Sequence, residues 1–342
     1  MSRSQNPTEI TLLEKGGEAE WTAFLAATDC GTLFHDLRFL AYHPPGRHRF
    51  AHLVARRGGK LIAVMPGGLV GAAERPIFTS PLGASLGGPA VAPDLKTEEM
   101  LDLTEALQRY VRDASWAGIE MVLPSSIHYG KPSDTLNFAL SFHGFEVMNR
   151  WLCQAIPIEP DVDERYRHLF RATQANRVRV GLRMGMRTAQ GGSDLLEPFL
   201  AVFDDTYRRH EAKPTHDHAE IADLLQRLPD RVQIHLTFLG DVPIAGLLVF
   251  LVNARVAYTF YICRNNAYLR EPGSVVAFAS LIDSLGASGH RWLDLGPSSR
   301  LGNFAQGITL FKEGLGGVGH CRDRWRWSVE HASTSDSVTR GA

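Results

Sequence analysis

The sequence predicts an α/β fold in which one structural unit occurs twice. The chain has 342 residues, enough for two domains that each bury a core. In the first half the segment WAGIEMVLPSS stands between two helix signals, and ASGHRWLDLGPSS stands in the same context in the second half. Gly118 and Gly289, and then Gly144 and Gly314, are each about 170 positions apart. These offsets favour a tandem duplication; the alternative is a chance similarity between two helix–strand–loop–helix segments.

The first half is expected to begin with helical and hairpin segments. The sequence pattern predicts these elements: a helix over 18–29, a loop or short helix over 33–42, strands at 50–55 and 60–64 joined by Gly58-Gly59, a Gly-rich loop at 80–89, a helix over 97–117, a strand at 119–123, a helix over 135–142 and a strand at 151–158. Gly144 is a natural C-cap for the helix predicted over 135–142.

The second half repeats the same kinds of signal after a helical start. Its expected elements are helical segments at 163–187, 194–212 and 217–228, a hairpin of strands 232–239 and 242–252, a strand at 255–263, a helix over 273–285, a strand at 292–295 and a last strand near 322–329. We therefore predict one unit over residues 1–160, a second over 161–330, and a disordered tail over 331–342.

Composition excludes several classes of function. The formal net charge is −1, so no global basic field favours nucleic acid or a membrane surface. The four cysteines are scattered without a C-x-x-C pair, which argues against a zinc site or a disulfide framework. The N-terminus is polar, and the longest apolar runs are too short to cross a bilayer. These features predict a cytoplasmic protein with no bound metal and no membrane span.

The segment from Trp292 to Gly316 is the strongest candidate for an active site. A short apolar strand ends at Asp294, a Gly-Pro-Ser-Ser loop follows, and an amphipathic helix carries Lys312. The position of the first half that corresponds to Asp294 is an apolar residue near Leu123, and the position that corresponds to Lys312 is Phe142. We expect the second unit to be catalytic and the first to have become a scaffold or the acceptor side.

Three segments of the second half resemble the FemAB-type transferases, which are tandem GNAT-fold proteins, and the related BioF2-like acetyltransferases. They are GDVPIAGLLVF, WLDLGPSS and GITLFKEGLGG. The family motif falls on Asp294, Gly296, Gly307, Phe311, Lys312 and Gly316, with Leu315 replacing the usual aromatic residue. The resemblance implies two GNAT-like units around a shared cleft. It also implies an N-acyltransferase or aminoacyltransferase that moves its group from an activated donor onto an acceptor amine by direct attack.

Two departures from the family leave the donor and the acceptor open. The chain lacks the long charged heptads of the coiled-coil arm found in the peptidoglycan enzymes. It also lacks the R-x-x-G-x-G/A pyrophosphate loop, having one glycine at the matching helix start, Gly273. The donor is therefore expected to be aminoacyl-tRNA or acyl-CoA, acting as a co-substrate and not as a tightly bound cofactor. The acceptor is a small-molecule, amino-sugar or peptide amine.

The chemistry is assigned to Lys312 and Asp294. A fixed ammonium aimed at the tetrahedral oxyanion would lower the barrier to aminolysis, and packing of Ile308, Leu310 and Phe311 would hold the lysine stem; the alternative is a surface lysine. Asp294 would accept the proton of the amine; the alternative is that it caps N–H groups of the next loop. No cysteine or serine has a recognisable base partner, so no covalent intermediate is expected.

Other residues are expected to bind substrate. The segment 171–187 carries five arginines and no acid, so Arg177, Arg179 and Arg183 would hold phosphates of tRNA, CoA or a nucleotide-linked acceptor; the alternative is a solvated helix face. The remaining candidates are Phe311, Lys213, His216, Tyr261, Ser298 and Tyr129. As an alternative function, the chain is a catalytically inactive GNAT-like protein that binds a phosphorylated ligand.

Overall fold

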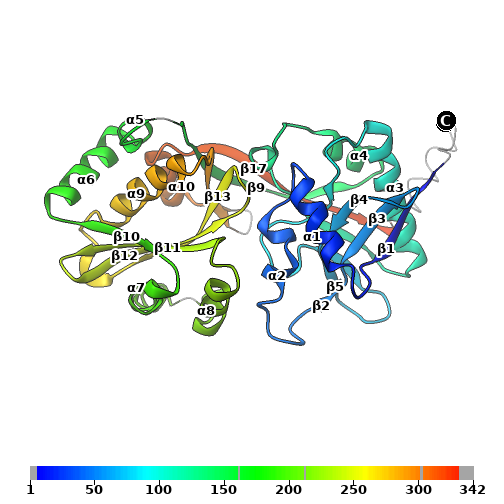
Figure 1. Cartoon of the computed structure of the whole chain (residues 1–342), viewed down its shortest axis with the longest axis horizontal. Coiled ribbons are helices and arrows are strands. Elements are labelled where there is room, and N and C mark those ends of the chain that lie inside the picture. The colour runs from blue at the N-terminus through cyan, green and yellow to red at the C-terminus, as the bar shows by residue number, and fades with distance from the viewer. Residues whose placement is uncertain (1–5, 161, 212, 301–302, 331–342) are drawn as a thin grey trace. The chain divides into compact units, whose positions relative to one another are not determined.

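The computed structural model describes residues 6–160, 162–211, 213–300 and 303–330, and it divides into two compact units. The first comprises the described residues up to Arg150 together with those from Arg322 onward, and the second is Trp151–Cys321. Figure 1 colours the chain from its N-terminus to its C-terminus, so the contribution of residues 322–330 to the first unit can be followed. The predicted tail over 331–342 lies outside the described residues.

The first half of the chain forms the elements β1(Thr8–Leu12), α1(Glu18–Ala27), α2(Leu37–Leu40), β2(Arg49–Phe50), β3(Leu53–Arg57), β4(Lys60–Met65), β5(Gly68–Val70), β6(Ile77–Ser80), β7(Ala90–Val91), α3(Thr97–Asp113), β8(Gly118–Val122), α4(Thr135–Phe142) and β9(Glu146–Pro157). Strands β1, β3, β4 and β7 form one sheet in that order. In the other, β8 pairs in parallel with β6 and antiparallel with a late strand of the chain. Its core includes Leu107 of α3, Ile119 of β8 and Trp327.

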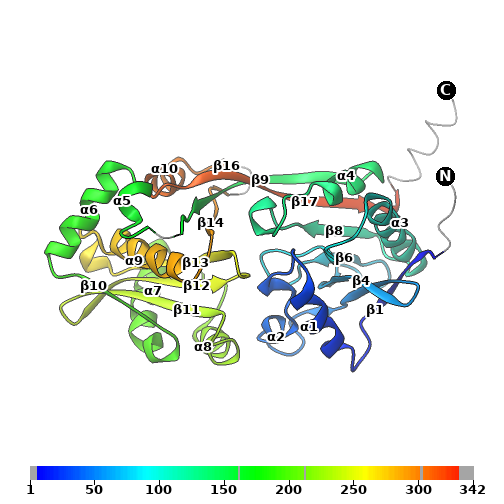
Figure 2. The same cartoon turned by 45° about the horizontal axis from the view of Figure 1, so that its top comes forward.

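The second half forms the elements α5(Tyr166–Leu169), α6(Ala172–Arg183), β10(Arg187–Gly191), α7(Leu196–His210), α8(His218–Arg227), β11(Val232–Leu239), β12(Val242–Leu251), β13(Val256–Arg264), α9(Gly273–Ala287), β14(Trp292–Pro297), β15(Ser299–Arg300), β16(Asn303–Phe304), α10(Gln306–Gly314) and β17(Val318–Ser328). The sheet of the second unit has the order β10-β11-β12-β13-β14-β9. Helices α6 and α9 cover one face, and α7 and α8 the other (Figures 1 and 2).

The predicted α/β class with a repeated unit is confirmed. In the first unit β6, α3, β8 and α4 occur in this order with the short β7 before α3, and β13, α9, β14 and α10 occur in the same order in the second with the short β15 and β16 before α10. Both successions place a long helix between two strands that pair in parallel: Ile77–Ser80 aligns with residues 118–121, and residues 256–258 align with 292–294. A helix that links two parallel neighbours is the crossover connection such strands require.

The change from one unit to the next differs from the predicted position near residue 160. Residues 153–157 of β9 pair with β14, so the second unit begins at Trp151. Residues 324–328 of β17 pair with β8 and return the chain to the first unit. Each unit therefore takes a strand from the other half of the sequence. Local sequence composition does not reveal which distant strands will pair.

The predicted helical segment over 163–187 is wrong at its C-terminal end. Helix α6 ends at Arg183, and Gly185 has a φ of +80°, the left-handed backbone that commonly ends a helix. Arg187 then opens β10, where it aligns with Phe238 of β11. Arg183 and Arg187 consequently do not share a helix face, although their four-residue spacing predicts it.

One buried histidine gives a testable pH dependence of stability. The side chain of His235 on β11 is fully buried, and neither ring nitrogen makes a hydrogen bond within the part of the chain that is described. Burial lowers its pKa from the usual 6.5 to about 4, so between these values the unfolded chain binds a proton that the folded chain does not. Folding stability therefore falls as the pH drops through this range, by about 2 kcal/mol at pH 5 from this residue.

We expect His235→Leu to remove that contribution, because leucine fills a similar volume without a titratable group. Urea unfolding at pH 8 and pH 5 measures the change. The variant should lose about 2 kcal/mol less than the wild type between the two pH values. His218→Gln, at a half-exposed histidine of the same unit, is the matched control. Equal pH dependence in wild type and His235→Leu would refute the assignment.

Candidate functional site

The strand-end aspartate lies at an irregularity in β14. The pairing of β14 with β9 shifts register between Asp294 and Pro297. The Asp294 side chain is fully buried, and its Oδ1 accepts a hydrogen bond of 2.7 Å from the N–H of Gly296. Gly296 has a φ of +72°, and a Cβ there would lie 3.0 Å from the Tyr258 hydroxyl. The D-x-G part of the motif thus encodes a turn that needs glycine on both counts.

Lys312 is buried, which excludes the surface-lysine interpretation. Its side chain comes from α10, and its Nζ donates to the carbonyl oxygens of Gly296 at 2.8 Å and Pro297 at 2.7 Å. Of the three apolar residues expected to hold its stem, only one packs inward. Phe311 contacts Phe278 in the core of the second unit, whereas Ile308 and Leu310 are half exposed. Leu310 lies about 200° around the helix from Lys312, so it faces away from the lysine. Ile308 has the i, i+4 spacing of a neighbour on the Lys312 face and is half exposed all the same.

The two predicted catalytic residues meet at one peptide segment. Asp294 accepts from the N–H of Gly296, and Lys312 donates to its carbonyl group. A third ionisable group, His320 on β17, places its Nε2 3.7 Å from Asp294 Oδ1. Neither ring nitrogen of His320 has a hydrogen-bond partner among the described residues. Sequence reasoning missed this histidine, because nothing in the local pattern distinguishes it from a solvent-facing strand residue.

Ser298 completes this corner of the second unit. It is buried, its hydroxyl donates to Gln154 Oε1 at 2.7 Å, and its N–H donates to the carbonyl of Leu152 at 2.7 Å. These bonds tie the loop after β14 to β9. Ser298 therefore anchors the loop in this structure, and a contact with substrate stays a prediction.

His216 and Tyr261 form a second group. Both the backbone N–H and Nδ1 of His216 lie within 3.0 Å of the Tyr261 hydroxyl oxygen. Burial raises the pKa of Tyr261 to about 12, so its hydroxyl stays protonated at neutral pH and pairs with either tautomer of the ring. His216 lines an open pocket of about 590 Å³ together with Asp204 and Asp217. Lys213 lies exposed in the same loop, close in sequence to that pocket.

The arginines of the 171–187 segment divide into paired and unpaired side chains. Arg171 forms an ion pair with Glu313 at 3.1 Å, and Arg187 with Asp241 at 3.2 Å. Arg179 and Arg183 lie exposed on α6 and make no ion pair or hydrogen bond with other described residues.

Arg177 is half buried and belongs to a cluster of positive charge. Burial lowers the pKa of Arg264, and the charges of Arg177 and Arg209 lower it further. The charge of Glu271 acts on Arg264 in the opposite direction, so the positive charge around Arg264 is partly offset within the protein.

The start of α9, which follows β13, is closed by packing. Gly273 and Ser274 are buried, and a Cβ on Gly273 would lie 2.8 Å from the side chain of Ile244. The helix N-terminus that matches the phosphate-binding position therefore has apolar cover. Strands β13 and β14, in contrast, pair only over residues 256–258 and 292–294 within the described chain, and beyond these residues they have no mutual ladder.

Tyr129 lies in the first unit, away in sequence from all the residues above. It is half-buried, its hydroxyl donates to the carbonyl of Pro124 at 3.1 Å, and desolvation raises its pKa. It lines a pocket formed within its own unit.

The described residues form neither a metal-binding cluster nor a membrane-spanning helix. In 6–160, 162–211, 213–300 and 303–330 there is no group of three or more histidine, cysteine, aspartate or glutamate side chains arranged to hold a metal ion. No helix formed by these residues has the length and apolar character needed to span a membrane.

Comparisons with known proteins identify the fold. Residues 164–305 match the family model described as Acetyltransferase (GNAT) domain. None of the curated proteins matches the chain. A structure described as FemX matches with a TM-score of 0.73 at 12% identity, covering 96% of this chain and 99% of that one. A tandem GNAT protein from the clavulanic acid biosynthesis pathway matches with a TM-score of 0.53 at 12% identity, covering 94% and 98%.

A third structure, L-PGS from Bacillus licheniformis, matches with a TM-score of 0.55 at 14% identity, covering 94% of this chain and 95% of that one. At these identities the likeness concerns the fold. The chain thus has the FemAB-like tandem GNAT fold, which confirms the resemblance seen in the sequence and the predicted fold class.

Proposed function

We propose that this protein transfers an acyl or aminoacyl group from an activated donor to an acceptor amine. The proposal rests on the two hydrogen bonds at Gly296: its N–H donates to buried Asp294, and its carbonyl oxygen accepts from buried Lys312. Burying two ionisable groups costs free energy, and in a fold used by acyltransferases a rigid pair of opposite charges at a strand end is suited to aminolysis.

The reaction proceeds by direct attack. The amine nitrogen forms a bond to the donor carbonyl carbon, and the resulting tetrahedral oxyanion collapses as the bond to the leaving oxygen or sulfur breaks. Lys312 contributes a fixed positive charge that favours the oxyanion through the low-dielectric surroundings. Asp294 takes the proton that the amine loses, directly or through a water, and the leaving group is protonated in turn.

Aminoacyl-tRNA is the donor that the surface chemistry supports first. The start of α9 is covered by Ile244, so it offers a pyrophosphate few free N–H groups. Arg179 and Arg183 instead present unpaired guanidinium groups along α6, and the cluster of Arg177, Arg209 and Arg264 adds positive charge. A backbone of evenly spaced phosphates fits distributed arginines better than a single pyrophosphate does.

Acyl-CoA is the second donor, and one observation favours it. Beyond Tyr258 and Asp294, β13 and β14 are no longer paired with each other in the described chain, so the backbone groups that face the gap between the two strands form no hydrogen bonds across it. An extended, amide-containing arm could hydrogen-bond along such an edge as an added strand.

The acceptor amine is assigned to the pocket at His216. Asp204 and Asp217 place two carboxylates on its lining, and a carboxylate is the natural partner of an ammonium group. Small-molecule, amino-sugar and peptide amines all carry an ammonium group, so the proposal covers all three classes of acceptor.

A competition experiment decides between the donors. Transfer of a radiolabelled acyl or aminoacyl group is followed in lysate with purified protein added, before and after ribonuclease treatment. Activity that disappears with ribonuclease and survives an excess of desulfo-CoA supports aminoacyl-tRNA, and the opposite result supports acyl-CoA. Binding of a phosphorylated ligand without any turnover would support the inactive alternative.

The arginine face gives a further prediction. We expect the double variant Arg179→Gln, Arg183→Gln to raise the KM for an aminoacyl-tRNA donor by about tenfold or more at low salt, because two phosphate contacts are lost. The slope of the logarithm of affinity against the logarithm of salt concentration should decrease by about the amount expected for two lost phosphate contacts. Arg187→Gln, which removes an arginine already paired with Asp241, is the matched control. Unchanged KM and salt slope in the double variant would show that α6 does not contact the donor.

A further inference from the structure

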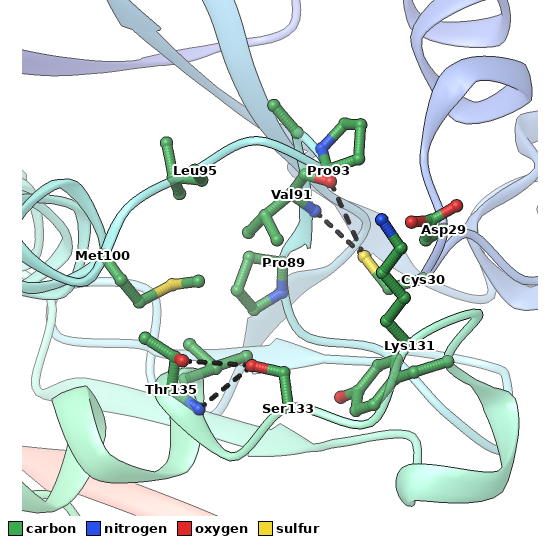
Figure 3. Close-up of a pocket in the computed structure, with 13 residues that line it drawn as sticks. Asp29, Cys30, Pro89, Val91, Pro93, Leu95, Met100, Lys131, Ser133 and Thr135 are labelled. Atoms are coloured by element: carbon green, nitrogen blue, oxygen red, sulfur yellow. Dashed lines mark hydrogen bonds between the residues drawn. The ribbon is translucent and has the colours of Figure 1, made fainter.

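The first unit contains a pocket that the proposed transfer reaction does not use. It has a volume of about 130 Å³ and lies between the segment after α1, the β7 segment, the start of α3 and the loop before α4. Figure 3 shows side chains from these four segments converging on it. Its polar lining includes Asp29, Cys30, Tyr129 and Lys131.

One wall of the pocket is held in place by hydrogen bonds. The Cys30 sulfur accepts from the N–H of Val91 at 3.2 Å, and Thr28 donates to the carbonyl of Val91. These contacts fasten the segment after α1 to β7. Burial raises the pKa of the Cys30 thiol, so this sulfur is a neutral wall group and not an activated nucleophile. A wall that is already fixed costs a ligand little ordering free energy.

The interior of the pocket is apolar and small. Met100 is almost fully buried, and Leu95 and Leu136, which are partly buried, line the same cavity. An apolar cavity of roughly 150 Å³ is known to accommodate a benzene-sized guest. The space therefore suits an aliphatic or small aromatic group of about four to six carbon atoms.

Two opposite charges stand at this pocket without forming an ion pair. Asp29 and Lys131 are both exposed and both line it, and neither side chain makes a hydrogen bond or ion pair with the described residues. Figure 3 shows Lys131 reaching from its loop toward Cys30, on the side where Asp29 lies. An ammonium and a carboxylate that face one pocket separately can each pair with the opposite charge of a single zwitterion.

From these features we infer that the first unit binds a free α-amino acid with a small apolar side chain. The side chain enters the cavity against Met100 and Leu136, the carboxylate pairs with Lys131, and the ammonium pairs with Asp29. This site goes beyond the proposed transfer reaction, and its occupation is measured by binding alone.

A ligand series tests the inference with the full-length protein, without any variant. Isothermal titration calorimetry compares L-leucine and L-valine with L-alanine, L-tryptophan, isocaproate and isoamylamine. Leucine and valine should bind at least about tenfold more tightly than the others, because alanine underfills the cavity, tryptophan exceeds it, and the last two each lack one charge. Equal affinity for leucine and isocaproate, or no measurable binding of leucine, would overturn the inference.

Variants locate the site. Lys131→Met and Asp29→Asn should each weaken leucine binding by about tenfold or more, since each leaves one ligand charge unpaired. Lys60→Met is the matched control, because it removes an exposed lysine of the same unit that does not line the pocket. Both test residues are exposed, so the variants should fold, and circular dichroism checks this. Wild-type affinity in Lys131→Met or Asp29→Asn would place the amino acid elsewhere.

Discussion

Replacing Lys312 with methionine is expected to lower kcat for transfer by about 10²–10³-fold, the usual effect of removing one oxyanion-stabilising group. The variant should also lose about 1–3 kcal/mol of unfolding free energy, because the carbonyls of Gly296 and Pro297 lose their buried donor. Steady-state kinetics and urea unfolding measure the two effects. Since both arise at one residue, the positioning role and the chemical role must be separated.

Lys312→Gln separates them. Glutamine keeps an N–H donor for the carbonyl groups but carries no charge, so it should recover part of the stability and none of the rate. Thr309→Val is the control for disturbance of α10, because it removes a buried hydroxyl from the same helix without changing a charge. If Lys312→Gln regains transfer in proportion to its stability, the lysine acts only by holding the 296–297 carbonyls, and the oxyanion role is refuted.

More of the fold than of the candidate site could be predicted from the sequence. Glycine signals pointed to the repeated unit, and in the structure Gly144 after α4 and Gly316 after α10 have left-handed backbone at equivalent places in the two copies. The exchange of β9 and β17 was not predictable, since it depends on pairings with β14 and β8 that are far away in sequence. Local patterns specify elements, whereas partners of a strand follow from the packing of the whole unit.

The site shows the same division between local and distant information. Asp294 and Lys312 could be singled out because the strand, the turn and the helix are consecutive in the chain. That Lys312 is buried could not, since its burial depends on how α10 packs back against the end of β14. His320 was missed for the same reason: only the return of the chain along β17 brings it to Asp294.

Asp294→Asn is the second decisive variant, and we expect it to lower kcat by about 10²-fold, the lower range for loss of a general base. Asparagine retains an oxygen that accepts from the Gly296 N–H, so the turn after β14 should persist. Asp294→Ala removes that acceptor as well, and it should be less stable than Asp294→Asn by about 1–3 kcal/mol because a buried N–H is left unpaired.

The comparison of the two Asp294 variants distinguishes a base from a structural cap. A base requires the negative charge, so both variants must be equally slow even though only Asp294→Ala is strongly destabilised. A cap requires only the acceptor oxygen, so Asp294→Asn would keep wild-type kcat while Asp294→Ala lost stability and activity together. We expect the first pattern, because a cap alone needs no buried carboxylate beside His320, and burying that charge costs free energy that a neutral asparagine would avoid.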